Sequence, residues 1–248
     1  MHKMTLTILT AALMSAAACK TTSESASTAG EPAANATQEL AVASEPDTPS
    51  TQLDPTSPEH LLFMLEEEKL ARDVHNALGE RWEHRTFTNI PRSEGRHMDA
   101  VSGLLKARGL PTDAASLPPG EFENEALQTM YVKLVARGQS SRLAAYEVGA
   151  LIEETDIRDL DAGLAADPPE DISRVYTNLR RASYNHLDGF VSAIESEGGT
   201  YTPGVLTPGR YEDARAQGAA HHEKRGKGHG KKGQGEGTDQ ESCEGHED

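Results

Sequence analysis

The chain has 248 residues, a formal net charge of −16 and only 4% aromatic residues. The strong negative charge argues against nucleic acid as a partner, because binding of phosphate groups requires a basic face. The chain has two cysteines, Cys19 and Cys243, which cannot build a disulfide framework or a cysteine-based zinc site. It lacks runs of alternating β-branched residues, and this favours an all-α fold.

Residues 1–19 have the pattern of a secretion signal, with a positive charge at Lys3, a short apolar run over 6–14 and small residues before Cys19. The apolar run is too short for a permanent bilayer span. A cysteine directly after small residues resembles the lipobox of bacterial lipoproteins, in which that cysteine is acylated; simple cleavage and secretion is the alternative. We therefore expect export across the inner membrane and a lipid anchor at Cys19, in the periplasm or at the outer membrane of the cell envelope.

Two further segments have compositions that do not support a packed core. Residues 20–56 are mostly Ser, Thr, Ala, Pro and Glu, so we expect a disordered tether there. We also expect a disordered tail over 206–248, which is rich in His, Gly, Lys and Glu. The tail either collects metal ions loosely or serves only as a soluble extension. The folded domain is then expected at 57–205, an ordinary size for a single domain.

Start and stop signals predict five helices in the folded domain. Ser57 and Pro58 open the first helix, Gly109 closes the second, and Ser140 or Ser141 caps the fourth. Most connections are short, so consecutive long helices are expected to lie side by side in antiparallel pairs. The expected ranges are 58–81, 89–109 (with a start between 89 and 91), 124–137, 141–166 and 169–197.

Each of the four long helices has an apolar stripe that polar residues interrupt near its middle. Burial of an unpaired carboxylate costs several kcal/mol, so one such helix would be hard to explain. Four helices that do this at a similar depth indicate that the polar groups meet around a cation. The polar residues on the stripes are Glu68 and His75, Glu94 and His97, Glu153, and Ser183 and His186.

Carboxylates and neutral imidazoles suit iron, manganese or zinc. Two divalent ions carry four positive charges, which four carboxylates would neutralise. With Glu68, Glu94 and Glu153, the fourth carboxylate is either Asp156 or Glu154. The Glu94-x-x-His97 element is itself a repeating part of dinuclear sites in four-helix bundles. The predicted metal ligands are Glu68, Glu94, His97, Glu153, Asp156 and His186.

Residues 68–75 followed by Glu94-x-x-His97 resemble the first half-site of rubrerythrin-like members of the ferritin-like superfamily. The core is most similar to an uncharacterised bacterial and archaeal ferritin-like family, the domain of unknown function 2202 family. The resemblance covers about residues 57–200 and implies a ferritin-like antiparallel four-helix bundle, here with one extra short helix, and a carboxylate-bridged site for two iron ions. The matching stretches are 62–73, 93–100, 149–157 and 185–187.

The fifth helix departs from the ferritin-like pattern, because Ser183 stands where a second Glu-x-x-His element would place its glutamate before His186. Glu153-x-x-Asp156 is a possible replacement, and a mononuclear site is the alternative. His75 occupies a position where rubrerythrin-like proteins tend to carry a tyrosine.

Simpler interpretations stand beside the metal site. Glu68 could pair with Arg72 on a surface, and Glu94 with His97 in the same way. Asp156 could cap a helix break, and His186 could be an ordinary core histidine. Two further expectations concern neighbouring acids: Glu66 and Glu67 are expected to face solvent, and Glu147 with Glu154 could form an alternative inward face.

Three functions follow from these patterns. A di-iron site would react with dioxygen or hydrogen peroxide, with Tyr146 and Tyr176 near the ligands and with electrons from an external donor, since the chain has no rubredoxin-type cysteine centre. The alternatives are a tethered metal-binding or sequestering lipoprotein without turnover, and a structural bundle without metal. A homodimer is possible for a bundle of this size.

Overall fold

The computed structural model describes residues 53–54 and 57–229, with side chains up to residue 220. The expected secretion signal, the lipid anchor at Cys19, nearly all of the tether and the tail beyond residue 229 lie outside the described residues. The described part is all-α, with six α-helices and no strand. The elements are α1 (Pro58–Trp82), α2 (Arg85–Ala107), the 3-10 helix η2 (Asp113–Ser116), α3 (Glu125–Gly138), α4 (Arg142–Ala165), α5 (Glu170–Ser196) and α6 (Pro208–His229).

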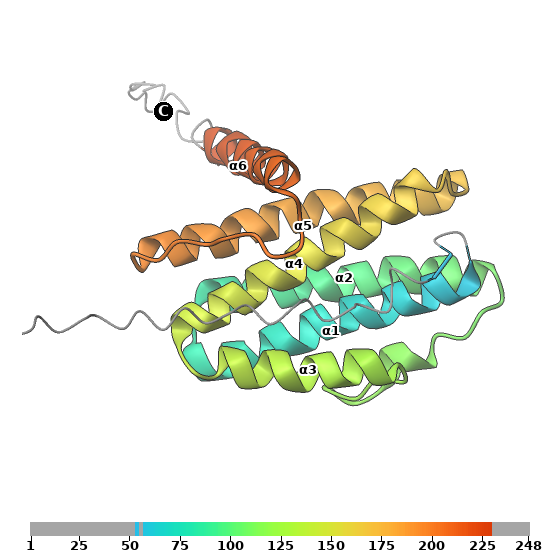
Figure 1. The fold of residues 1–248 in the computed structure, drawn as a ribbon. Helices are drawn as coiled ribbons and strands as arrows, with labels where there is room; N and C mark the ends of the chain where they lie inside the picture. The colour runs from blue at the N-terminus through green and yellow to red at the C-terminus, as the bar shows by residue number, and fades with distance from the viewer. Residues whose placement is uncertain (1–52, 55–56, 230–248) are drawn as a thin grey trace, which may run out of the picture. The chain divides into compact units, whose positions relative to one another are not determined.

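The four long helices α1, α2, α4 and α5 pack around one core as two antiparallel hairpins (Figure 1). α1 pairs with α2, and α4 pairs with α5, while contacts of α1 with α4 and of α2 with α5 join the two hairpins. α3 packs against α1 and α4, and α6 packs against α5 (Figure 1). Among the described helices, none has both the length and the apolar character needed to cross a membrane.

Local capping explains most of the helix starts. The side chain of Ser57 accepts a hydrogen bond from the backbone N–H of His60, and that of Ser141 accepts one from Ala144. Asn124 caps α3 in the same way. Each cap satisfies N–H groups that have no partner within the helix. The expected starts and ends of α1, α3, α4 and α5 are thereby confirmed to within one or two residues.

The expected start of α2 was wrong, because the helix begins at Arg85 and contains Pro91 in its interior. A proline there removes the backbone N–H that would bond the carbonyl of Phe87. Packing compensates for this loss, since Phe87 is buried and its ring stacks on Tyr146 with the centroids 5.7 Å apart. The imidazole of His84 caps the additional turn.

Side chains of α1 hold the segment that joins α2 to α3. The buried ammonium group of Lys69 donates to the Asp73 carboxylate at 2.6 Å and to the carbonyl oxygens of Pro118 and Glu121 at 3.0 Å. All three of its N–H donors are thus satisfied, as a buried lysine requires. The Glu66 carboxylate accepts hydrogen bonds from the backbone N–H groups of Glu123 and Asn124, immediately before α3. The expectation that Glu66 faces solvent is therefore wrong.

The predicted tail boundary at residue 206 is also wrong, because α6 occupies Pro208–His229 and its first half is packed. Leu206, Tyr211 and Ala214 are buried against the rest of the domain. Gly218 lies so close to α5 that a Cβ atom there would come within 2.2 Å of the Tyr184 carbonyl oxygen. The packed domain therefore extends well beyond residue 205.

Candidate metal centre

Seven polar side chains from four helices converge in the interior of the bundle. Helical periodicity directs them inward, since residues three, four or seven apart lie on the same face of a helix. All are buried except His186, whose side chain is 12% exposed. They are Glu68 and His75 of α1, Glu94 and His97 of α2, Glu153 and Asp156 of α4, and His186 of α5.

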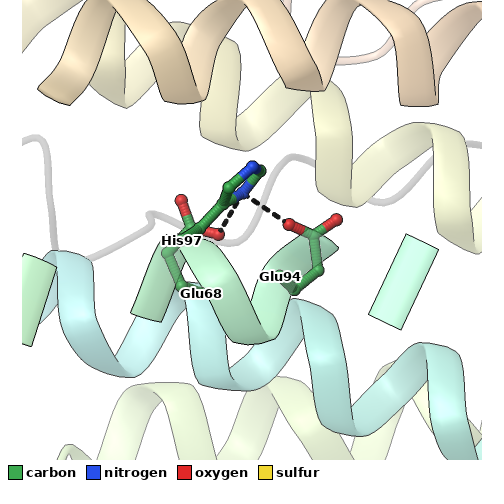
Figure 2. A group of neighbouring side chains, drawn as sticks. All are labelled: Glu68, Glu94 and His97. Atoms are coloured by element: carbon green, nitrogen blue, oxygen red, sulfur yellow. Dashed lines mark hydrogen bonds and ion pairs between the residues drawn. The ribbon is translucent and has the colours of Figure 1, made fainter. Parts of the chain in front are cut away.

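Glu68, Glu94 and His97 form the first group that could hold a metal ion, with one ligand atom from each lying within 4.8 Å of the others. Nδ1 of His97 lies 3.1 Å from Oε2 of Glu68 and 2.7 Å from Oε2 of Glu94. Figure 2 shows the imidazole between the two carboxylates. The one-turn spacing of Glu94 and His97 therefore brings them to the same point, and Glu68 meets them from α1.

His75, Glu94 and Glu153 form the second group, again with ligand atoms within 4.8 Å of one another. Glu94 belongs to both groups and lies between them. His75 is fully buried, and its ring is 5.0 Å from that of Phe190. Neither ring nitrogen of His75 has a hydrogen-bond partner among the described residues.

His186 and Asp156 complete the convergence. Nδ1 of His186 lies 2.9 Å from Oε1 of Glu94 and 3.4 Å from Oε2 of Glu153. The hydroxyl of Ser183 donates a hydrogen bond to Oδ2 of Asp156. The structure thus brings all six predicted ligands into one cluster, where Asp156 already has a hydrogen-bond partner.

The electrostatics of the cluster favour the positively charged form of two of its histidines. Burial alone disfavours the charged imidazole, but the carboxylates of Glu68 and Glu94 raise the pKa of His97 to about 12. Burial also lowers the pKa of His186, but the carboxylates of Glu94 and Glu153 outweigh this effect and raise that pKa to about 10. His75 has no such compensation, and burial lowers its pKa to about 4.

The pKa values of the carboxyl groups in the cluster are shifted in opposite directions. Burial by itself raises the pKa of Glu94, but the neighbouring His186 and His97 outweigh it and hold that pKa well below its ordinary value. Burial raises the pKa of Glu153 to about 7, and that of Asp156 well above its usual range, with further contributions from Glu68 and Glu153. The cluster therefore holds more carboxylate groups than its histidines can neutralise.

The donor set fits transition-metal cations. Several of its buried atoms have no hydrogen-bond partner among the described residues, although such atoms normally have one. A cation would satisfy them at once, and mixed carboxylate and imidazole ligands suit iron, manganese or zinc. The unpartnered atoms are Oε1 of Glu68, Oε1 of Glu153, Oδ1 of Asp156 and both ring nitrogens of His75.

The sequence profile of the family described as "Uncharacterized protein domain (DUF2202)" matches residues 57–215. The chain belongs to this family. The matched range includes the first part of α6, in agreement with the packed domain seen here.

A curated relative and a solved structure extend the comparison of this DUF2202 domain. Uncharacterized protein MJ0754 of Methanocaldococcus jannaschii is 39% identical over 165 residues, which cover 66% of this chain and 89% of that protein. The crystal structure of hypothetical protein MJ0754 from Methanococcus jannaschii is similar with a TM-score of 0.61 and 40% identity, over 65% of this chain and 94% of that chain.

Two of the simpler interpretations of the DUF2202 residues are wrong. Glu68 is not a surface partner of Arg72, because it is buried and contacts His97. Asp156 does not cap a helix break, because α4 continues through it to Ala165. Its carboxylate lies inside the bundle with Ser183 as its partner.

Glu67 and Glu154, two acids next to predicted ligands, do not lie where the sequence led us to expect them. Glu67 is buried, and burial together with Asp159 and Asp156 raises its pKa well above the ordinary value. Glu154 is buried as well, but it faces the segment before α6, where it accepts hydrogen bonds from the N–H groups of Val205 and Leu206. Between Asp156 and Glu154, only Asp156 therefore joins the cluster.

His75 is the residue that sequence reasoning did not include among the ligands, although it lies on the same stripe as Glu68. The signal for His75 was its two-turn spacing from Glu68, which places both on one face of α1.

The two tyrosines of the inner stripes do not lie beside the predicted ligands. The hydroxyl of Tyr176 is 3.1 Å from Nδ1 of His60, and Tyr146 packs on the rings of His84 and Phe87.

Proposed function

We propose that this DUF2202 domain is a ferritin-like bundle that binds two metal ions, with iron expected and manganese or zinc as possible substitutes. One ion would be held by Glu68, Glu94 and His97. The other would be held by Glu153, His186 and His75, with Glu94 as the bridging carboxylate. The observation that carries this proposal is the pair of buried ligand groups that share Glu94.

Bound metal and the residues around it would have separate roles. Bound iron would supply redox chemistry toward dioxygen or hydrogen peroxide. In the metal-free protein, His97 and His186 each hold a proton against the carboxylates, and metal binding must displace these protons because imidazole binds a metal in its neutral form. Phe87 and Phe190 pack around His75 and keep water from that side of the cluster.

Oxidoreductase activity would require electrons from an external donor. The expected export signal and the lipid anchor at Cys19 would place the reaction in the cell envelope, tethered to a membrane. The first experiment for this location is labelling of the expressed chain with a radioactive fatty acid. A Cys19→Ala variant should lose the label.

A second candidate function is binding of metal without turnover. Ser183 supports it, because this residue replaces the carboxylate that a second Glu-x-x-His element would provide. Fewer anionic ligands favour a site that retains an ion weakly or in a single position. Such a protein would sequester metal at the envelope.

Metal analysis tests both candidates. The full chain is loaded anaerobically with ferrous ion and desalted, and its metal content is measured by mass spectrometry. We expect about two irons per chain, and a loss of at least one in Glu94→Gln, which keeps the shape of the side chain. The matched control is Glu147→Gln. Glu147 lies on the outside of α4, where it forms an ion pair with Arg137.

The outcomes separate the functions. Two irons that are lost in the Glu94 variant, with consumption of hydrogen peroxide by the loaded protein and a reductant, would support the oxidoreductase. Stable iron without peroxide consumption would support sequestration. A chain that binds no iron, manganese or zinc would show that the cluster is only a structural polar network.

A further inference from the structure

A second polar pocket lies outside the metal centre, between α1, α2 and η2. Its volume is about 280 Å³ and it shares no residue with the proposed ligands. This volume is just below the range of about 300–1,000 Å³ that is usual for drug-sized ligands. The pocket therefore suits a small ion with a few waters, or one polar end of a larger molecule.

The pocket is lined by two cationic side chains, Arg72 and Lys106, and by one acid, Asp99. Arg72 contributes a guanidinium group, which Asp73 orients through contacts of 2.8–2.9 Å. Asp73 is already shared with Lys69, so one carboxylate faces two cations. Lys106 adds a further ammonium group, which forms no ion pair with any described residue. Two cations thus meet in a pocket of a chain whose net charge is −16.

Hydroxyl groups complete the lining. Ser102, Thr112 and Ser116 all line the pocket with their hydroxyl groups. Ser102 is the most informative of them, because it is only 8% exposed. Ser102 is therefore the hydroxyl that packing holds most firmly at the wall of the pocket.

Gly95 leaves part of the pocket floor without a side chain. A Cβ atom added there would meet no other atom within 4 Å. The floor is consequently open backbone of α2, and a ligand can approach the helix closely.

We propose that this pocket binds phosphate, either as the free ion or as the phosphoryl group of a monoester. Arg72 and Lys106 would supply the charge, since a guanidinium and an ammonium are the usual phosphate-binding groups. The three hydroxyls would donate to the remaining oxygens. Asp99, an exposed acid that also lines the pocket, would accept a hydrogen bond from the P–OH group of hydrogen phosphate and would repel the fully ionised sulfate ion. Phosphate should therefore bind better than sulfate.

The test is calorimetric titration of the metal-free full chain with inorganic phosphate at constant ionic strength. Absence of metal prevents binding of phosphate to an ion in the metal centre. We expect Lys106→Gln to weaken phosphate binding about tenfold, the usual effect of losing one hydrogen bond to a charged group. Lys133→Gln removes the same charge from the outside of α3, and it should leave the affinity unchanged.

Two further variants probe the shape and the selectivity of the pocket. Gly95→Ala keeps every charge and favours the helix, so a loss of binding in it would reflect occupation of the pocket by the methyl group. Asp99→Asn should reduce the preference for phosphate over sulfate. A parallel titration with glycerol phosphate distinguishes the two sources, because tighter binding than that of phosphate would assign the site to a monoester.

The proposal is overturned if phosphate binds no better than chloride. It is also overturned if Lys106→Gln and Lys133→Gln weaken binding equally, since the ion would then respond only to the general charge of the chain. Equal binding of phosphate and sulfate would remove the role given to Asp99.

Discussion

At the scale of single residues, His75 has an unusual environment. It is fully buried, and neither of its ring nitrogens has a hydrogen-bond partner among the described residues. Burial lowers its pKa to about 4, so it is neutral at pH 7. Burial of unpaired polar atoms reduces the stability of the metal-free protein, and a bound cation would reverse this effect.

His75→Leu should therefore have opposite effects on the two forms of the protein. The metal-free variant should be more stable by roughly 1–2 kcal/mol, because unpaired polar atoms are replaced by apolar ones. The metal-loaded form should bind one ion less tightly by tenfold or more. Urea unfolding with and without metal measures both quantities.

His60→Leu is the matched control for this substitution. His60 is equally buried, but its Nδ1 pairs with the hydroxyl of Tyr176. Its replacement should destabilise the metal-free protein by roughly 1–3 kcal/mol and leave metal content unchanged. A destabilised metal-free His75→Leu variant would contradict the unpaired burial of His75, and an unchanged metal affinity would contradict its role as a ligand.

Periodicity predicted which residues face the core but could not predict how the helices are oriented around each other. Glu68, Glu94 and Glu153 were placed correctly because each shares a stripe with apolar residues. Glu66 and Glu67 were misplaced, since α1 is covered on several sides by α2, α3, α4 and η2 and has almost no solvent-facing surface in its middle. Distances between helices, which decide whether His75 meets Glu94, are not encoded in a single helix pattern.

At the scale of elements, Glu154 of α4 fastens the segment between α5 and α6. Its carboxylate accepts hydrogen bonds from the hydroxyl of Tyr201 at 2.5 Å and from the N–H groups of Val205 and Leu206 at 3.0 and 2.8 Å. Burial, together with Glu154, raises the pKa of Tyr201 far above its ordinary value. One side chain thus satisfies several donors of an otherwise irregular segment.

Glu154→Ala should lower the free energy of unfolding by about 3 kcal/mol or more, because buried N–H groups would lose their acceptor. Glu154→Gln keeps one acceptor oxygen and should have a smaller effect. Urea unfolding gives the free energies, and limited proteolysis of the 199–207 segment reports whether the loss is local. Equal stability of Glu154→Ala and the unchanged chain would contradict the anchoring role.

At the scale of the whole molecule, α6 extends the domain beyond the boundary expected from the sequence. Its sequence has few large apolar residues and no continuous stripe, so periodicity gave no signal for it. The helix is held by burial of Tyr211 and Ala214, by an ion pair between Arg215 and Asp188 of α5, and by an ion pair between Arg210 and Asp161 of α4. Contacts of this kind, which depend on polar and small side chains, can be recognised only once α4 and α5 provide the opposing surface.

A chain that ends at residue 205 should melt about 10 °C lower than the full chain, because burial of Leu206 and Tyr211 is worth several kcal/mol. A chain that ends at residue 229 keeps α6 and serves as the control. Its melting temperature in calorimetry should match that of the full chain. Equal melting of the two truncated chains would indicate that α6 adds no stability.

Glu153 and Glu154 are consecutive on α4 and point about 100° apart around the helix axis. One faces the metal centre and the other faces the segment before α6. Any displacement of that segment that turns α4 must therefore also turn Glu153 relative to the other proposed metal ligands. By thermodynamic linkage the relation is reciprocal: a partner that pulls on the C-terminal region would change metal affinity, and the metal would change affinity for that partner by the same factor.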